Sequence, residues 1–171
     1  MRIARAMAIT VLVLPVVAAA AGVGLRLFME RGAESALYPG DDVAITALRG
    51  ALPPNAYLAC PPGYCAVAGA APSPTFAVGA DRLYTAFGRL IAAEPRVVTV
   101  LAEPEQRRII VIQRSAVFGF PDLVTAEIVA LAADRSSLAL YSRARYGHSD
   151  FGVNRRRVEQ WLARLPALAN Q

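Results

Sequence analysis

RVVTVLAEPEQRRIIVIQR, residues 96–114, is the stretch of the sequence that decides the fold. Residues 97–101 and 108–114 are runs rich in valine and isoleucine, and the polar residues 103–107 lie between them. Side chains branched at Cβ favour an extended backbone, and two such runs joined by a short polar segment are typical of a β-hairpin. The stretch therefore predicts two antiparallel strands.

The sequence on either side of this hairpin predicts two more strands and two helices. Residues 80–93 place apolar side chains at helical spacing, and Glu94-Pro95 then ends the helix. Residues 123–131 and 138–146 are predicted strands, and residues 151–165 a closing helix. This order predicts an α+β fold, in which a four-stranded antiparallel meander sheet has both helices packed on one face.

An uncharged apolar run begins at Ala6 and ends at Leu25, with Arg2 and Arg5 before it. Twenty such residues form a helix of about 30 Å, long enough to cross the hydrocarbon core of a bilayer. The same run, with small residues at positions 18–21, also fits a cleavable signal peptide. We therefore expect either an N-terminal transmembrane helix or a signal peptide, and in both cases most of the chain is exported.

The sequence divides the chain into three parts. We expect residues 1–28 to be the transmembrane anchor or signal peptide, residues 29–54 a tether with several prolines and glycines, and residues 55–168 the folded α+β domain. In the anchored case the protein crosses the inner membrane of a bacterium once, and the domain lies in the periplasm. In the other case the protein is secreted after cleavage.

The net charge of +5 does not indicate a nucleic-acid partner. All 18 basic residues are arginine, which together with the high alanine content indicates a GC-rich bacterial genome. The excess is local, since residues 132–171 carry seven arginines against three acidic residues. An exported protein rarely meets nucleic acid, so we expect no such partner.

Alternation along residues 138–146 divides the last predicted strand between two faces. Leu138, Leu140 and Ser142 lie on one face, and Tyr141, Arg143 and Arg145 lie on the other. The apolar set is expected to face the helices. This leaves an arginine stripe on an open face of the sheet.

Two interpretations of the arginines remain open. In the first, Asp122, Asp150 and Asn154 belong to a network of ion pairs and caps that pins the closing helix to the sheet. In the second, guanidinium groups bind a carboxylate or a phosphate, such as a lipid head group or an acidic segment of a partner protein. The candidate anion-binding residues are Arg114, Arg143, Arg145 and Arg157.

These residues also fall in a pattern that resembles the bacterial DUF1499 family. In the family's order, its elements are Arg114-Ser115, then Phe120-Pro121-Asp122, then Ser142-Arg143-x-Arg145-x-Gly147-x-x-Asp150-x-Gly152-x-Asn154-x-x-Arg157. The resemblance covers roughly residues 55–165, and the turn between the two cysteines is one residue shorter than in many members. It implies a fold and domain boundaries but no established activity.

His148-Ser149-Asp150 contains the residue types of a hydrolase without the expected geometry. Neighbouring side chains in an extended segment diverge, whereas a catalytic triad requires hydrogen bonds between them. His148 could still act as a general base with Ser149 or Ser142, and this hydrolase is an alternative hypothesis. We favour a protein without catalytic residues.

The two cysteines, Cys60 and Cys65 in the stretch CPPGYC, are expected to form a disulfide. Two thiolates and one histidine are too few for a closed zinc site, and the chain has no Cys-x-x-Cys motif. Disulfides persist in exported proteins, and Pro62-Gly63 favours a tight turn between the cysteines. We expect neither a metal nor a cofactor.

The expected function is that of a membrane-anchored protein of the bacterial envelope, acting as a binding or accessory module without catalysis. Its ligand would be an anionic lipid or an acidic protein partner held by the arginines, and residues 6–25 would contact the membrane. A purely structural role in envelope assembly is a further alternative.

Overall fold

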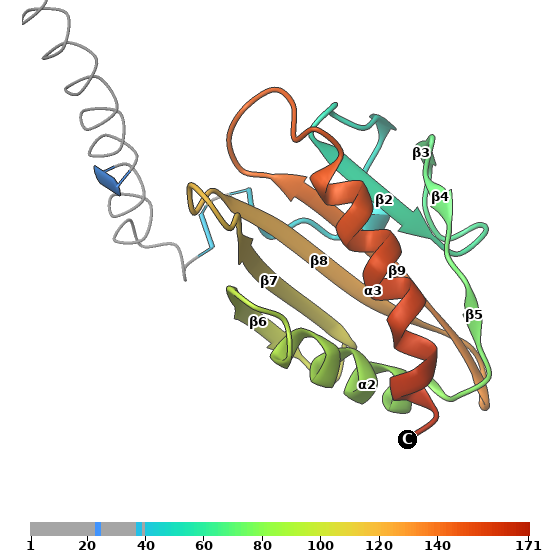
Figure 1. The fold of residues 1–171 in the computed structure, drawn as a ribbon. Helices are drawn as coiled ribbons and strands as arrows, with labels where there is room; N and C mark the ends of the chain where they lie inside the picture. The colour runs from blue at the N-terminus through green and yellow to red at the C-terminus, as the bar shows by residue number, and fades with distance from the viewer. Residues whose placement is uncertain (1–22, 25–36, 39) are drawn as a thin grey trace, which may run out of the picture.

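The computed structural model describes residues 23, 24, 37, 38 and 40–171 (Figure 1). The transmembrane helix or signal peptide expected in residues 1–28 lies outside the described residues, apart from residues 23 and 24. Within the described part of the chain, no helix is long and apolar enough to cross a membrane.

A mixed sheet of seven strands, with two helices packed on it, forms the domain (Figure 1). The strands of this sheet are β2 (Ala56–Cys60), β4 (Ala71–Pro72), β5 (Thr75–Phe76), β6 (Val97–Glu103), β7 (Arg108–Arg114), β8 (Pro121–Ala132) and β9 (Arg135–Ala144). The helices are α2 (Ala80–Ala92) and α3 (Val153–Ala169). A short 3-10 turn, η1 (Ile45–Ala47), and a small parallel pair, β1 (Gly50–Ala51) and β3 (Val67–Ala68), lie outside this sheet.

The sheet is larger than the four-stranded meander that the sequence predicts. The expected strands are present, and β6, β7, β8 and β9 pair in that order with antiparallel neighbours. In addition, β2 pairs antiparallel with the other edge of β9, β4 pairs parallel with β2, and β5 also pairs with β9. The prediction of a simple antiparallel meander is therefore wrong. The added strands have two to five residues, too few to show a clear alternation of apolar and polar side chains.

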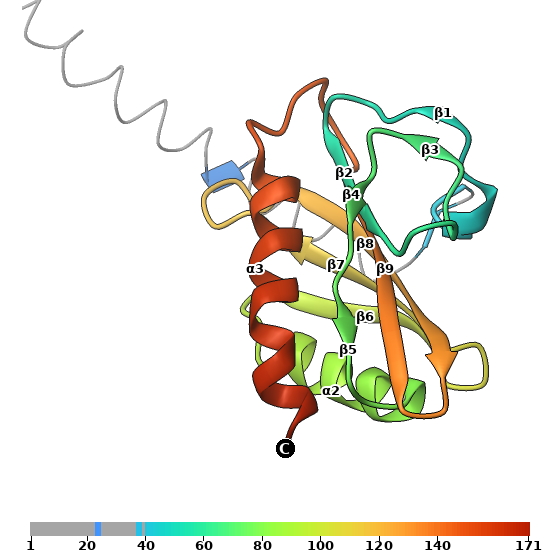
Figure 2. The same ribbon diagram turned by 90° about the vertical axis from the view of Figure 1, so that its right-hand side faces the viewer.

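Both helices cover one face of the sheet, as the sequence predicts (Figure 2). Phe87 of α2 and Trp161 of α3 meet edge to face, with ring centroids 5.9 Å apart. The strands contribute Val124, Leu138 and Leu140, all fully buried under the helices. Burial of each such side chain contributes about 1.5–3 kcal/mol, so this face forms the main core.

The opposite face of the sheet is also covered, by a segment that we call the N-terminal strap (residues 37, 38 and 40–48). Ile45 of the strap is fully buried, and its backbone N–H donates a hydrogen bond to Glu127 Oε1 at 2.8 Å. Leu37 packs against the cluster of Ile110, Ile112 and Leu123. The strap lies within residues 29–54, where the sequence indicates a tether, and these described residues pack on the domain.

The disulfide between Cys60 and Cys65 is present, which confirms the prediction. It closes the loop after β2 and holds Tyr64 near the second face of the sheet, where the tyrosine hydroxyl donates to Glu127 Oε2 at 2.9 Å. Burial, and the negative charge of Glu127, raise the pKa of Tyr64 to about 12. The disulfide thus fastens this loop beside the buried part of the strap.

Candidate functional site

The four candidate anion-binding arginines do not meet in one site. Arg143 and Arg145 lie on the second face of the sheet and both bind Asp41 of the N-terminal strap. Arg143 Nη2 lies 2.8 Å from Asp41 Oδ1, and Arg145 pairs with Asp41 Oδ2. The guanidinium of Arg145 also stacks on the ring of Tyr38, 4.3 Å from its centroid. These two arginines therefore hold an anion, and that anion is a buried carboxylate of the same chain.

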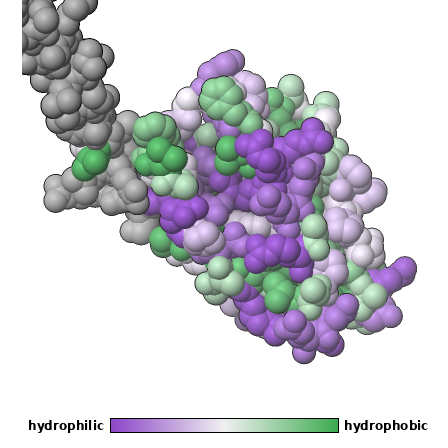
Figure 3. All heavy atoms as spheres, in the orientation of Figure 1, coloured by the Kyte–Doolittle hydropathy of each residue, from purple (hydrophilic) through white to green (hydrophobic). Residues whose placement is uncertain are grey.

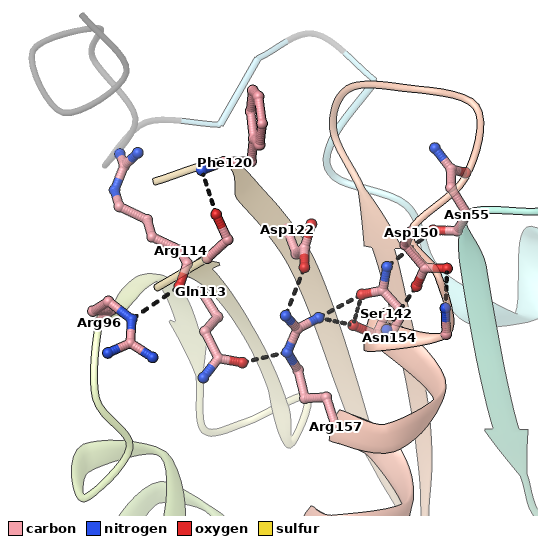
Figure 4. Close-up of polar contacts among 12 residues, drawn as sticks. Asn55, Arg96, Gln113, Arg114, Phe120, Asp122, Ser142, Asp150, Asn154 and Arg157 are labelled. Atoms are coloured by element: carbon pink, nitrogen blue, oxygen red, sulfur yellow. Dashed lines mark hydrogen bonds and ion pairs between the residues drawn. The ribbon is translucent and has the colours of Figure 1, made fainter. Parts of the chain in front are cut away.

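Arg157 is buried in the first turns of α3 and joins this helix to three strands (Figure 4). Its Nη2 lies 2.6 Å from Asp122 Oδ2 on β8, and its Nη1 donates to Ser142 Oγ on β9 at 2.9 Å. Its Nε donates to Gln113 Oε1 on β7. Breaking a buried ion pair leaves a desolvated charge without compensation, so Arg157 fastens α3 to the sheet.

Asn154 and Asp150 extend this buried network to the loop before α3 (Figure 4). Asn154 Oδ1 accepts from Ser142 Oγ at 2.6 Å, and Asn154 Nδ2 donates to the backbone oxygen of Asn55 at 3.0 Å. Asp150 Oδ2 accepts from the Asn154 N–H at 2.7 Å, and its Oδ1 accepts from the Gly152 N–H at 3.0 Å. Asp150 thus satisfies N–H groups at the start of a helix, which have no partner within the helix.

The carboxyl group of Asp122 is the buried acid of this network. Burial raises the pKa of Asp122, the charge and hydrogen bond of Arg157 lower it, and the negative charge of Asp150 raises it, so that the pKa is raised on balance. The ionised form of Asp122 is therefore costly in the folded protein and depends on Arg157 for compensation.

A cleft of about 280 Å³ lies beside the buried network, and we call it the basic cleft. It opens between the N-terminal half of α3, the end of β7 and the turn before β6. Its charged and amide lining residues are Glu94, Arg96, Gln113, Arg114, Arg156, Arg157 and Gln160. Glu94, the one carboxylate among the lining residues, pairs with Arg164 of α3. The lining therefore has an excess of positive charge, which complements a phosphate or a carboxylate.

Arg96 and Arg156 bind backbone carbonyl groups at the wall of the basic cleft. Arg96 Nε donates to the oxygen of Arg114 at 3.2 Å, and Arg156 Nη1 donates to the oxygen of Phe151 at 3.0 Å. A carbonyl oxygen accepts a hydrogen bond without neutralising the guanidinium charge. Both side chains are exposed and keep further N–H donors for a ligand.

Arg114 also lines the basic cleft, but its side chain points away from Arg157 (Figure 4). Its Nη1 donates to the backbone oxygen of Gly119 at 3.2 Å, at the base of the loop between β7 and β8. Of the four arginines singled out in the sequence, Arg114 and Arg157 thus belong to the cleft.

Sequence reasoning missed Arg96 and Arg156 as cleft residues. The predicted hairpin could have identified Arg96. Val97 pairs with Gln113, so Arg96, the residue before Val97, lies opposite Arg114. The Arg114 N–H donates to the oxygen of Arg96 at 3.0 Å, as this register requires. Arg156 joins them only through the docking of α3, which no local pattern predicts.

His148 is exposed in the loop between β9 and α3 and does not line the basic cleft. Ser142 is buried and bound to Asn154, and Ser149 Oγ accepts from the Phe151 N–H at 3.3 Å. Within the described residues, no serine hydroxyl is hydrogen-bonded to His148, and no group of three or more potential metal ligands occurs. The pair that a serine hydrolase requires is not assembled.

The chain matches a known protein family. The model of the family described as "Protein of unknown function (DUF1499)" matches residues 71–165. This range contains all the lining residues of the basic cleft, and the buried network except for Asn55. The comparison with curated proteins finds no match.

Proposed function

The chain belongs to the DUF1499 family, and this membership does not identify a reaction. We propose that the protein is a binding module of the bacterial envelope. Its basic cleft binds an anionic group, a phosphate or a carboxylate, without transforming it. The apolar run of residues 6–25 anchors the protein in the inner membrane, and the domain lies in the periplasm.

The observation that carries this proposal is the positive charge of the basic cleft. Arg96 and Arg156 present guanidinium groups whose hydrogen bonds go to neutral carbonyl oxygens. A guanidinium offers parallel N–H donors that match two oxygens of a phosphate or carboxylate. Residues 155–157 also place three arginines in the first turns of α3, where cations oppose the helix dipole. Arg155 pairs with Glu159 and Arg157 with Asp122, so a bound anion would relieve Arg156.

The proposed location is supported by two independent features. The apolar run is long enough to cross a bilayer, and the Cys60–Cys65 disulfide is typical of proteins that fold outside the reducing cytosol.

The structure favours neither alternative function. The hydrolase requires His148 next to a serine hydroxyl, and the exposed position of His148 gives it no such partner among the described residues. A role in envelope assembly through contacts on the second face of the sheet is not favoured, because the N-terminal strap packs on that face.

Thermal unfolding of the full chain in detergent tests the proposal. Inorganic phosphate should raise the melting temperature more than sodium chloride at equal ionic strength, because a ligand that binds only the folded state stabilises it. The double variant Arg96→Gln/Arg156→Gln should lose this difference. Arg82→Gln, which removes an exposed arginine of α2 that does not line the cleft, should keep it. If phosphate raised the melting temperature of all three proteins equally, the basic cleft would not be the binding site.

A further inference from the structure

The loop between β7 and β8, residues 115–120, exposes apolar side chains beside the basic cleft. Val117, Phe118 and Phe120 are all exposed, and the two phenylalanine rings lie 5.8 Å apart. Figure 3 shows this loop as an apolar projection with hydrophilic residues next to it. A contiguous exposed apolar patch marks a site of contact with another molecule or with a membrane.

Hydrogen bonds hold this loop in a closed turn. The Ser115 N–H donates to the oxygen of Phe120 at 2.9 Å, and the Phe120 N–H donates to Ser115 Oγ at 3.0 Å. The Gly119 N–H donates to the oxygen of Ser115 at 3.2 Å. The apolar side chains are therefore held outward by an ordered backbone, which lowers the entropy lost on binding.

A further exposed aromatic side chain stands on the α3 side of the basic cleft. Phe151 is 87% exposed, and its carbonyl oxygen accepts the hydrogen bond from Arg156 of the cleft. On the other side, Arg114 and Ser115 belong both to the cleft lining and to the base of the β7–β8 loop. Both loops lie at the end of the domain away from the C-terminus (Figures 1 and 2). Apolar side chains thus flank the arginines of the cleft from two elements.

A short connection in the sequence joins the domain to the N-terminal apolar run. Leu37 packs against the cluster of Ile110, Ile112 and Leu123 on β7 and β8, the two strands that the loop joins. Residues 26–36 connect Leu37 to the end of the apolar run. Even fully extended, this connection spans only about 40 Å.

We propose that this end of the domain docks on the surface of an anionic bilayer, with Val117, Phe118 and Phe120 inserted among the lipids and a lipid phosphate in the basic cleft. The phosphate assignment rests on the proposed function, whereas the insertion of the loop does not. Aromatic rings favour the interface between head groups and acyl chains, and arginines near the surface are attracted to anionic head groups. An anionic bilayer matches both features of this surface.

A fluorophore that reports on its environment, attached to Phe118→Cys, tests the insertion in the full chain reconstituted into liposomes. Cys60 and Cys65 are joined in a disulfide, so the introduced thiol is the one that reacts without reductant. In vesicles of phosphatidylcholine and phosphatidylglycerol, the emission should shift to the blue and be quenched by brominated lipids. In phosphatidylcholine alone, the quenching should fall by about threefold or more, because the attraction of the arginines is lost.

Leu131→Cys is the matched control. Leu131 is 48% exposed against 46% for Phe118, and it lies at the opposite end of β8. Its fluorophore should remain in water in both kinds of vesicle. A Phe118→Cys signal that equals the Leu131→Cys signal, or that is the same in neutral and anionic vesicles, would overturn the proposal.

Two further variants separate the loop from the cleft. Arg96→Gln/Arg156→Gln should reduce the quenching at position 118 in anionic vesicles, and Phe118→Ser/Phe120→Ser should leave the stabilisation by inorganic phosphate intact. If phosphate stabilises the wild-type protein and the probe at position 118 stays in water, the docking fails and the proposed function stands. If the probe inserts and phosphate does not stabilise the protein, the proposed function fails and the insertion of the loop stands.

Discussion

Arg157 and Asp122 form the ion pair on which the junction between α3 and the sheet depends. Both side chains are buried, and the guanidinium also binds Ser142 and Gln113. A buried ion pair contributes little net stability over an apolar pair of the same shape, but losing one partner is costly. The pair therefore makes the position of α3 specific, and with it the position of Arg156 in the basic cleft.

Arg157→Met should destabilise the domain by about 3–5 kcal/mol at neutral pH, since it leaves the buried carboxyl group of Asp122 without its partner. Burial already raises the pKa of Asp122, and the loss of Arg157, which lowers it, raises it further. The folded variant then binds a proton more tightly than the unfolded chain, so the variant becomes more stable as the pH falls through the pKa of the folded state. The difference in unfolding free energy between the variant and the wild type therefore becomes smaller at low pH. Urea unfolding of both proteins at about pH 7 and about pH 4.5 measures this change.

The control for this prediction removes the titrating group. In the Asp122→Asn background, Arg157→Met should cause a loss of stability that is independent of pH, because the amide at position 122 does not titrate in either of the two proteins compared. If Arg157→Met lost the same unfolding free energy relative to wild type at both pH values, Asp122 would not be the source of the loss.

At the scale of elements, the N-terminal strap depends on charges that β8 and β9 supply. Asp41 binds Arg143 and Arg145, and the backbone of Ile45 binds Glu127. These contacts link a short segment of little regular structure to the centre of the sheet.

Asp41→Asn should loosen the strap while the sheet and helices remain folded. The variant removes the charge that pairs with Arg143 and Arg145, at a cost of about 1–3 kcal/mol. Native-state hydrogen exchange should then show faster exchange at the Ile45 N–H, with exchange in β8 unchanged. Asp134→Asn, in the exposed turn between β8 and β9, is a suitable control. Unchanged protection at Ile45 would mean that the apolar contacts alone hold the strap.

The sequence predicts the longer elements, in which the spacing of apolar side chains repeats several times. β6 to β9 and both helices follow from β-branched runs and helical spacing, whereas the five residues of β2 and the two of β4 carry no such signal. The start of α3 is displaced from residue 151 to Val153 because Phe151 and Gly152 take left-handed backbone angles, φ 52° and 75°. Such a turn depends on backbone conformation and not on apolar spacing.

For the candidate site, alternation in β9 assigns Arg143 and Arg145 to the second face, because the period of a strand fixes the face of every side chain. The partner of these arginines, Asp41, is 102 residues away from Arg143 and no local pattern connects them. The cleft likewise depends on the docking of α3. The sequence therefore predicts which residues carry charge on which face, and tertiary packing decides which of them stay available for a ligand.

For the molecule as a whole, the strap adds packed residues ahead of residue 55, where the sequence predicts the start of the folded domain. A fragment of residues 55–171 should be less stable than a fragment of residues 37–171, because the loss of buried Ile45 alone removes about 1.5–3 kcal/mol. It should also bind a hydrophobic dye through the bared face of the sheet. Thermal unfolding and dye fluorescence of the two fragments measure both effects. Equal melting temperatures would show that the strap adds nothing to stability.

The covered second face also determines when the domain can finish folding during its synthesis. Asp41 precedes Arg143 by 102 residues, and Ala56 of β2 pairs with Arg143 as well. At the usual rates of translation, the first part of the domain waits about 5–20 s for its partner strand. Contacts between distant segments also form slowly, because a long loop must close before they are made. The part of the domain made first is therefore the last to be stabilised, and it stays exposed to proteases and to aggregation until the final strand and helix have emerged.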